Sequence, residues 1–325
     1  MAGGHARERT ALIATVLNEA ATIDALLESV AAQSRPPDEV VIVDGGSTDG
    51  TWQRLQAWSR RGTLPLRLEQ APGATIARGR NLAIGACSAE LIAVTDAGVR
   101  LEPDWLAYLL ARLRPGIDVV AGFFVPDPQT TFERAMGATV LPTLQDVQPA
   151  SFLPSSRSVL FRRSAWEHVG GYPDWLDYCE DLVFDLALRR AGHRFAFASD
   201  AVVHFRPRGS LRALFAQYRH YARGDGKADL WRRRHAVRYA TYLLIPYLVR
   251  RGWAGRLLVL LGGLAYTRRP YERLAAYLHD LQPPEVAHAI MLVPTIRLVG
   301  DLAKMLGYPA GILWRLQRWT SRSSS

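Results

Sequence analysis

The sequence predicts an α/β fold, a mainly parallel sheet with flanking helices, and three observations support this prediction. Short apolar runs alternate with amphipathic stretches through the first 120 residues, which is the order that βαβ units produce. No hairpin turn pattern separates these runs. Polar clusters follow several runs at their carboxyl ends, where sheets of this class bind ligands. These clusters are therefore the first candidates for a functional site.

The first part of the chain supplies four strands and three helices in alternation. Its apolar runs predict strands at 11–17, 39–43, 64–69 and 91–95. Helices are predicted at 20–33, 51–59 and 76–86. In the first helix, apolar residues from Ile23 to Val30 recur at i, i+3, i+4 and i+7, which places them on one face. Pro36 ends this helix, because proline lacks the backbone N–H needed to continue it.

The remaining chain consists of an irregular middle and an apolar, basic end. Prolines interrupt residues 119–205, which contain a predicted helix at 182–191 and predicted strands at 194–198 and 201–205. Beyond about residue 230 the composition shifts to leucine, arginine and aromatic residues. The predicted domains are an α/β domain at 1–228 and a basic, apolar helical region at 229–325.

Composition excludes several classes of protein. The chain has 325 residues, 49% of them apolar, which excludes a disordered protein and allows one large or two moderate domains. Its two cysteines, Cys87 and Cys179, form no CxxC pair, which excludes a disulfide scaffold and a cysteine-based zinc site. The first residues carry no secretory signal, so we expect an intracellular protein.

The charge of the chain is unevenly distributed. Residues 1–200 hold 19 Lys and Arg against 24 Asp and Glu, a net charge of −5. Residues 201–325 hold 21 against 6, a net charge of +15. A strongly basic region of this kind indicates a polyanionic partner, either nucleic acid or an anionic membrane surface.

Several common catalytic and nucleotide-binding motifs are absent from the sequence. No GxGxxG follows the first predicted strand, and no GxxxxGK[ST] occurs, which excludes a dinucleotide fingerprint and a P-loop. HExxH and GxSxG are missing as well. The remaining chemical signal is a set of carboxylate-rich loops on a parallel sheet.

Four segments resemble, in order and spacing, the family 2 glycosyltransferases of the GT-A fold. They are 10–51 with VVIVDGGSTDGT, 73–106 with AVTDAG, 170–192 with YCED and 217–226 with QYRHY. The resemblance covers about residues 1–226 and implies a GT-A form of the predicted fold. It also implies an inverting enzyme that moves a sugar from a nucleotide-sugar donor to a hydroxyl acceptor.

The resemblance assigns Asn18, Glu19, Asp44 and Arg80 to the donor pocket. The first two would line the nucleoside, although they could instead cap the following helix. Asp44 matches the acid that contacts the base or ribose. A guanidinium suits phosphate oxygens, and the segment has two arginines, Arg78 and Arg80. Residues two apart do not share a helix face. We therefore expect Arg80 to bind the diphosphate and Arg78 to be a surface charge.

Asp96 is the strongest metal candidate. The family places a DxD after the fourth strand to bind a divalent ion, and this chain has Asp96-Ala97-Gly98. Mg²⁺ and Mn²⁺ sites can use one or two carboxylates with phosphates and water, so we expect Asp96 to hold Mg²⁺ or Mn²⁺. His204, at the end of a predicted strand, is a second candidate ligand. The alternatives are that Asp96 caps a turn and that His204 is structural.

Glu180 and Asp181 resemble the family's ED motif, in which the aspartate is the general base. The reaction requires a carboxylate that faces the acceptor hydroxyl, and the resemblance assigns this role to Asp181. It places Glu180 on the acceptor side. The alternative is an acid pair that opens a helix, because acidic residues also favour helix N-termini.

The segment from Gln217 to Tyr221 resembles a relaxed QxxRW signature. Gln217 and Arg219 are the expected contacts to the acceptor or diphosphate. Because the Arg-Trp step is replaced by His220-Tyr221, we do not expect polysaccharide synthesis. The glycines in the Gly224–Gly226 stretch predict a mobile loop or a surface turn.

Two apolar runs in the basic region, 239–249 and 257–266, are each too short to cross a bilayer. A spanning helix needs about 20 apolar residues. Joining the runs would bury Arg250, Arg251 and Arg256, at roughly 3 kcal/mol each. The arginines and nearby aromatic residues are instead typical of helices that lie in the interface of an anionic leaflet.

Residues 287–319 continue the same mixture of apolar and basic residues. We therefore expect attachment to the cytoplasmic face of the cell membrane, with an ordinary helical subdomain as the alternative. The region is too apolar for a nucleic-acid-binding tail and has no recognition motif.

The sequence leads to a metal-dependent, inverting glycosyltransferase with a lipid-linked or membrane-proximal acceptor. Its alternative is a non-catalytic, membrane-attached module that binds a nucleotide sugar and carries a degraded DxD. A nucleotidyltransferase ranks last, because no Gly-rich basic loop follows the first predicted strand.

Overall fold

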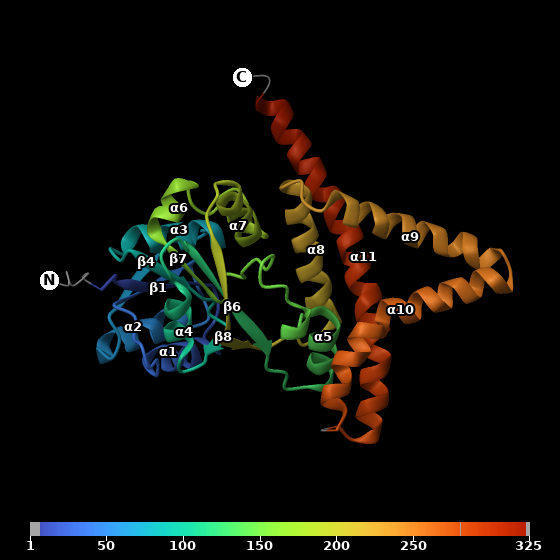
Figure 1. Cartoon of the computed structure of the whole chain (residues 1–325), viewed down its shortest axis with the longest axis horizontal. Helices are drawn as coiled ribbons and strands as arrows, with labels where there is room; N and C mark the ends of the chain where they lie inside the picture. The colour runs from blue at the N-terminus through green and yellow to red at the C-terminus, as the bar shows by residue number, and fades with distance from the viewer. Residues whose placement is uncertain (1–6, 280, 323–325) are drawn as a thin grey trace. The chain divides into compact units, whose positions relative to one another are not determined.

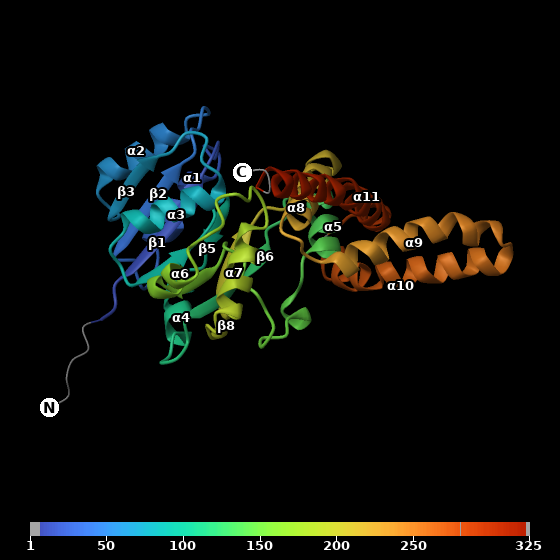
Figure 2. The ribbon, with the colours of Figure 1, turned by 90° about the horizontal axis from the view of Figure 1, so that it is seen from above.

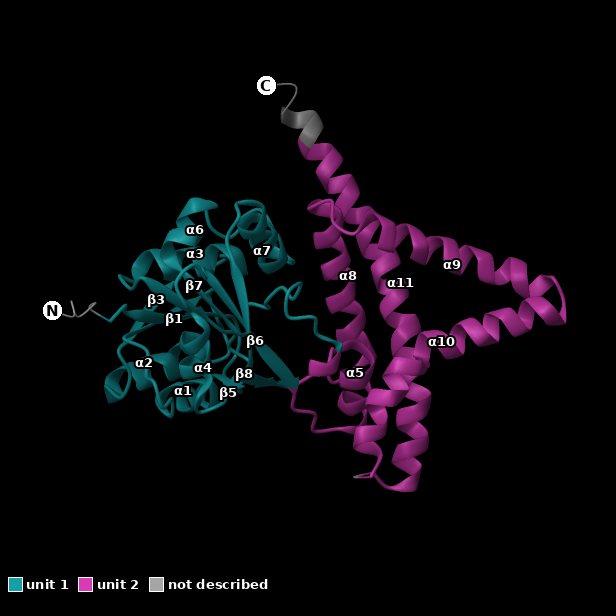
Figure 3. Cartoon of the chain, viewed as in Figure 1, with its two compact units in different colours: residues 1–125, 146–205 teal, residues 126–145, 206–325 magenta. Residues whose placement is uncertain are grey.

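The structure, a computed structural model, describes residues 7–279 and 281–322. The chain forms two compact units (Figures 1 and 3). Unit 1 comprises residues 1–125 and 146–205, and unit 2 comprises 126–145 and 206–325. Each unit is defined by the contacts among its own residues. The predicted division after residue 228 separates the α/β domain from the basic, apolar helical region, and it stays a prediction.

Unit 1 is built on an eight-stranded sheet. Its strands are β1 (Thr10–Val16), β2 (Glu39–Asp44), β3 (Leu66–Gln70), β4 (Leu91–Val94), β5 (Val99–Leu101), β6 (Val119–Pro126), β7 (Val159–Arg162) and β8 (Phe195–Phe205). The strand order is β3-β2-β1-β4-β7-β6-β8-β5. The first four strands pair in parallel, while β4–β7, β6–β7 and β5–β8 pair antiparallel. The α/β prediction is confirmed, and the antiparallel half is a feature that it did not contain.

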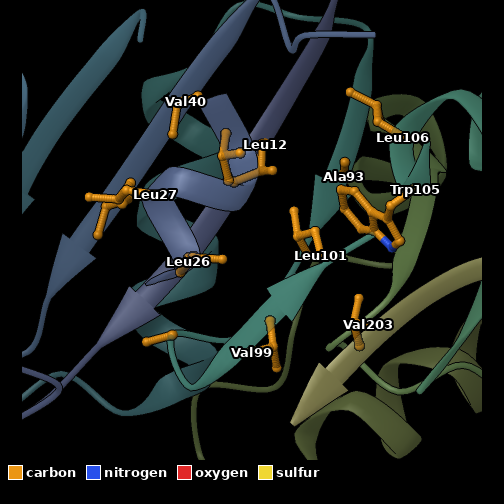
Figure 4. Close-up of a cluster of buried hydrophobic side chains, with 14 of the residues drawn as sticks. Leu12, Leu26, Leu27, Val40, Ala93, Val99, Leu101, Trp105, Leu106 and Val203 are labelled. Atoms are coloured by element: carbon orange, nitrogen blue, oxygen red, sulfur yellow. The ribbon is translucent and has the colours of Figure 1, made fainter. Parts of the chain in front are cut away.

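Helices flank this sheet as predicted. They are α1 (Ile23–Ala31), α2 (Thr51–Arg61), α3 (Ile76–Ala86), α4 (Trp105–Arg112), α6 (Arg163–His168) and α7 (Glu180–Arg190). Successive residues of a strand point to opposite faces, so β1 serves two cores. Leu12 packs with Leu26 and Leu27 of α1 (Figure 4), whereas Ile13 packs with Ala77 of α3. Burial on both faces explains why β1 is a continuous apolar run.

The two strands predicted at 194–198 and 201–205 are one strand, β8. The separate prediction was wrong because Asp200, which lies between the two runs, stays in the extended backbone with an exposed side chain. A polar residue on the solvent face of a strand does not interrupt its pairing.

Unit 2 is helical. Its helices are α5 (Thr131–Val140), α8 (Leu211–Lys227), α9 (Arg232–Arg250), α10 (Trp253–Leu278) and α11 (Pro283–Arg322), and a short 3₁₀ turn, η1 (Leu144–Asp146), spans the boundary between the units. Two apolar clusters join α5 to the C-terminal helices. One packs Met136 against Leu214 and Ile296, and the other packs Ala138 against Leu274.

Helices α8 and α11 approach each other closely through glycines. A Cβ at Gly226 would lie 2.3 Å from the carbonyl oxygen of Tyr308, and a Cβ at Gly311 would lie 2.2 Å from that of Arg223. The expectation of a loop or turn at 224–226 is therefore wrong, because these residues complete α8. Their glycine content serves backbone-to-backbone packing rather than a turn.

We expect Gly311→Ala to lower the melting temperature by roughly 5 °C, since overpacking of this kind typically costs about 1–3 kcal/mol. Gly300→Ala, on the same helix, is the matched control, because a Cβ there meets no atom within 4 Å. Alanine is a better helix former than glycine, so the control should melt at the same or a higher temperature. Thermal unfolding followed by circular dichroism measures both, and equal melting temperatures would contradict the close approach.

Candidate active site

The carboxyl ends of β1 and β2 lie side by side in the parallel half of the sheet. Val16 is in register with Asp44, so the loops that follow both strands leave the same edge. The loop after β4 reaches the same edge of the sheet, because Gly98 in this loop lies close to Glu19 in the loop after β1. A Cβ at Gly98 would lie 3.8 Å from Oε2 of Glu19. Three polar loops predicted from sequence therefore meet at one edge.

Hydrogen bonds tie the first two loops together. Asn18 has a positive φ of 56°, donates its backbone N–H to Oγ of Ser47 at 2.8 Å, and accepts from the backbone N–H of Thr48 at 2.8 Å through Oδ1. The carboxylate of Asp49 accepts from the backbone N–H of Ala20 at 3.0 Å. These bonds fix the shape of the loops, and Asn18 and Asp49 both contribute to it.

Asn18 and Glu19 could, from the sequence, have capped the helix that follows them, α1. Residue Thr22 precedes α1 as its N-cap, and neither Asn18 nor Glu19 caps that helix with its side chain. Oε2 of Glu19 instead accepts a hydrogen bond from Oγ1 of Thr22 at 2.5 Å. Asp49 accepts from the backbone N–H and hydroxyl of Thr51, which lowers the pKa of its carboxyl.

Asp44 is fully buried and organises the loop that follows it. Its Oδ1 accepts hydrogen bonds from the backbone N–H of Ser47 at 3.1 Å and from the hydroxyl of the same residue at 2.6 Å. Nε2 of Gln70, at the end of the adjacent β3, lies 3.5 Å from Oδ2. The structure therefore gives Asp44 an ordering role, and its contact with the nucleoside stays a prediction.

Arg80 is the central residue of the site. Its side chain is 3% exposed; Nη1 donates to Oε1 of Glu180 at 2.7 Å and Nη2 donates to Oδ1 of Asp96 at 2.9 Å. Arg78 is exposed on the same helix, α3, as expected of a surface charge. A Cβ at Gly79 would lie 2.7 Å from a methyl carbon of Thr15, so α3 packs closely on β1 and turns Arg80 inward.

A second arginine reaches Asp96. Nε of Arg157 lies 3.5 Å from Oδ2 of Asp96, and its guanidinium lies over the ring of Phe205 at 4.8 Å. Sequence reasoning missed Arg157, which stands outside the four motif segments, in the irregular middle of the chain. An aromatic face stabilises a guanidinium without neutralising it, so Arg157 adds positive charge beside Asp96.

The first turn of α7 completes the cluster. Burial raises the pKa of Glu180 to about 7, and the carboxylate of Asp181 contributes in the same direction against the opposing charge of Arg80. Asp181 is half-buried and interacts electrostatically with Arg80. Residues 96, 180 and 181, far apart in sequence, therefore gather around one guanidinium.

Asp185 lies one turn further along α7 and is 3% exposed. Its Oδ2 has no hydrogen-bond partner, and burial together with the charge of Asp181 raises the pKa of its carboxyl well above the usual value. Burial of this kind disfavours the charged form of a carboxyl. Asp181 is therefore the acid at this end of α7 that retains solvent access and is not locked in an ion pair with Arg80.

His204, the second predicted metal ligand, has a carboxylate as its neighbour. Its Nε2 contacts the carboxylate of Glu102, across the β5–β8 pair in which His204 is in register with Arg100. Within residues 7–279 and 281–322, no three His, Cys, Asp or Glu side chains gather as a metal-binding group. Asp96 and His204 as metal ligands stay predictions.

Gln217 and Arg219 belong to unit 2. Nε2 of Gln217 donates to the hydroxyl of Tyr221 at 2.9 Å. Arg219 and Arg223 line a cavity of about 360 Å³ between α8 and α11, together with Trp314. Contact of either residue with the acceptor or the diphosphate stays a prediction.

Comparison with known families is consistent with this geometry. Residues 11–169, which contain β1 to β7 and most of the site, match the family described as Glycosyl transferase family 2. The chain therefore carries a glycosyltransferase family 2 domain. It is an enzyme that transfers glycosyl groups, as the sequence predicted, and the alternative of a non-catalytic module is not kept.

The alignments with two curated relatives of this glycosyltransferase cover most of the length of each relative. The succinoglycan biosynthesis protein ExoA of Rhizobium meliloti is 28% identical over 269 residues, which is 78% of this chain and 79% of ExoA. Glycosyltransferase AglE of Haloferax volcanii is 28% identical over 229 residues, 68% of this chain and 73% of AglE.

Solved structures confirm the GT-A fold of the glycosyltransferase. The mannosyltransferase PcManGT of Pyrobaculum calidifontis, solved with GDP-Man and Mn²⁺, superposes with a TM-score of 0.59 at 21% identity and covers 95% of this chain and 88% of PcManGT. S. aureus TarS residues 1–349, solved with UDP-GlcNAc, gives a TM-score of 0.51 at 16% identity, with coverage of 96% and 92%. At these identities the likeness concerns the fold.

Proposed function

We propose that this glycosyltransferase moves a sugar, with inversion, from a nucleotide-sugar donor to the hydroxyl of a lipid-linked or membrane-proximal acceptor. The convergence of Asp96, Arg80 and Asp181 at the carboxyl edge of the sheet carries this proposal. The donors GDP-Man and UDP-GlcNAc in the two superposed structures support a nucleotide sugar. The two donors carry different nucleobases. An experiment must therefore distinguish uridine, guanosine and thymidine donors.

On the donor side, the arginines would bind the diphosphate. Arg80 and Arg157 both reach Asp96, so two guanidinium groups face one partly exposed carboxylate. A planar guanidinium matches phosphate oxygens well. The loops after β1 and β2, with Asn18, Glu19 and Asp44, would hold the nucleoside at the same edge.

Asp96 and Glu19 supply carboxylate oxygens of the kind that a divalent ion takes. Its carboxylate is 33% exposed, and the carboxylate of Glu19 lies beside Gly98, the position of the second acid in DxD. Mg²⁺ and Mn²⁺ are held by one or two carboxylates, water and substrate phosphates. Asp96 would be the protein ligand, and the bound ion would neutralise charge on the departing diphosphate.

On the acceptor side, Asp181 would remove the proton from the attacking hydroxyl. Glu180 is 8% exposed and locked in its ion pair with Arg80. We therefore assign Glu180 to positioning Arg80 rather than to direct contact with the acceptor. Gln217 and Arg219, predicted from the sequence, remain the proposed acceptor contacts.

Membrane attachment at the cytoplasmic face is the final part of the proposal. In the described part of the chain, one helix is long and apolar enough to cross a membrane, residues 283–318 with a mean hydropathy of 1.5 over its best window. The net charge of +15 over residues 201–325 favours an anionic surface.

A screen for donor binding tests the proposal. We expect one of UDP-, GDP- or dTDP-sugars to raise the melting temperature when Mn²⁺ is present, because a ligand that binds only the native state stabilises it, by about 2.7 kcal/mol at 100 times Kd. Asp96→Ala should lose the Mn²⁺-dependent part of this shift, while Asp200→Ala, at an exposed position, should retain it. A shift unchanged by chelator would contradict the metal, and no shift with any sugar nucleotide would contradict the donor site.

A further inference from the structure

The hairpin of α9 and α10 exposes an unusual amount of apolar surface. We call residues 243–264 the hairpin tip. Six of its apolar side chains are more than half exposed: Leu243, Trp253, Leu258, Leu260, Leu261 and Leu264. Figures 1 and 2 show the turn between α9 and α10 at the end of the hairpin that extends away from α5, α8 and α11. Large contiguous apolar patches on a protein surface mark sites of interaction.

The tip is a packed structure. A Cβ at Gly255 would lie 1.9 Å from the carbonyl oxygen of Leu248, so the two helices meet at backbone distance beside the turn. The guanidinium of Arg251 lies over the ring of Tyr247 at 4.7 Å. The apolar side chains are therefore presented by a fixed scaffold, with arginine and aromatic groups among them.

Helix α11, although apolar enough to span a membrane, packs one of its faces against other helices of unit 2. Asp301 on α11 is 4% exposed and accepts hydrogen bonds from Arg238 at 2.8 Å, Tyr242 at 3.1 Å and Tyr266 at 2.7 Å. These partners lie on α9 and α10, and Gly307 and Gly311 of α11 contact α8. Crossing a bilayer alone would remove Asp301 from all three partners.

The charge of the hairpin indicates which kind of partner it binds. Between Asp229 and Glu272 the sequence has nine arginines and no acidic residue. Two copies of this chain meeting tip to tip would bring like charges together. An anionic lipid surface offers both the apolar interior and the negative headgroups that complement the tip.

We propose that the hairpin tip is the surface through which this protein binds an anionic bilayer, lying in the interface, while α11 stays packed against α8, α9 and α10. The inference deepens the proposed membrane attachment by naming its surface. It does not depend on the sugar-transfer chemistry, because vesicle binding is measured without donor or acceptor.

Vesicle flotation of the full chain tests this surface. We expect binding to phosphatidylcholine vesicles that contain phosphatidylglycerol and weak binding to phosphatidylcholine alone. The variant Leu243→Glu/Trp253→Glu should bind the anionic vesicles at least about tenfold less. The control Leu306→Glu/Leu313→Glu changes two exposed leucines of α11 and should bind like the wild type.

Equal loss in both variants, or no loss in the tip variant, would overturn the proposal. So would retention of the wild-type chain in membranes after alkaline carbonate extraction, because that result indicates a spanning helix. A wild-type dimer that the tip variant converts to a monomer without lipid would assign the tip to a second copy instead. A nucleotide sugar should stabilise the tip variant as it does the wild type. If it stabilises neither protein, the result counts against the proposed function and not against the role of the tip.

Discussion

Asp181→Asn is expected to lower the rate of sugar transfer by about 10³-fold while donor binding is retained, because a general base contributes 10²–10⁴-fold and its amide cannot accept the proton. Asp181 is the acid of the α7 turn that is free to do this. Glu180 is held by Arg80, and Asp185 is buried, which raises the pKa of its carboxyl. Steady-state kinetics with the donor found by the screen measures kcat, and calorimetry measures donor affinity.

The control for this variant is Asp200→Asn, which makes the same chemical change at an exposed position of β8. It should transfer sugar at the wild-type rate. If Asp181→Asn turns over within about threefold of the wild type, the residue is not the base. Parallel loss of donor affinity and kcat would instead indicate damage to the donor pocket.

Replacing Arg80 by methionine should lower the free energy of unfolding by about 3 kcal/mol and abolish activity. The variant leaves Glu180 buried without its cation, and breaking one side of a buried ion pair typically costs 3–5 kcal/mol. Denaturant unfolding measures the change. Arg78→Met, two residues earlier on α3 and exposed, is the matched control and should stay within about 0.5 kcal/mol of the wild type.

The stability of the Arg80→Met variant should also depend on pH. Arg80 opposes the burial that raises the pKa of Glu180, so its loss raises that pKa further. A carboxyl with a raised folded-state pKa binds its proton more tightly in the fold, so stability is lost as pH rises above 4.5 through that pKa. The deficit relative to wild type should therefore be larger at pH 8 than at pH 5. The double variant Arg80→Met/Glu180→Gln should remove this dependence, and a deficit independent of pH would show that Glu180 is not the uncompensated charge.

Local pattern was sufficient to predict much of the catalytic unit. Strands β1 to β4 were predicted from short continuous apolar runs, and helix α1 from apolar residues that recur with the period of a helix. The predicted donor loops lie together because parallel strands end at the same edge. The antiparallel strands β6 and β7 were not predicted, since their pairing depends on partners distant in sequence.

The sequence by itself determined the alternating α/β order, the polar loop ends and the charge of the C-terminal helices, because these are properties of neighbouring residues. Only the tertiary structure decided which charges meet. It buried Arg80 and exposed Arg78, brought Arg157 to Asp96, and paired Glu180 with a guanidinium 100 residues away. It likewise placed Asp301 in a core and left the hairpin tip uncovered. Burial and ion pairing depend on what packs against a residue, and no local pattern carries that information.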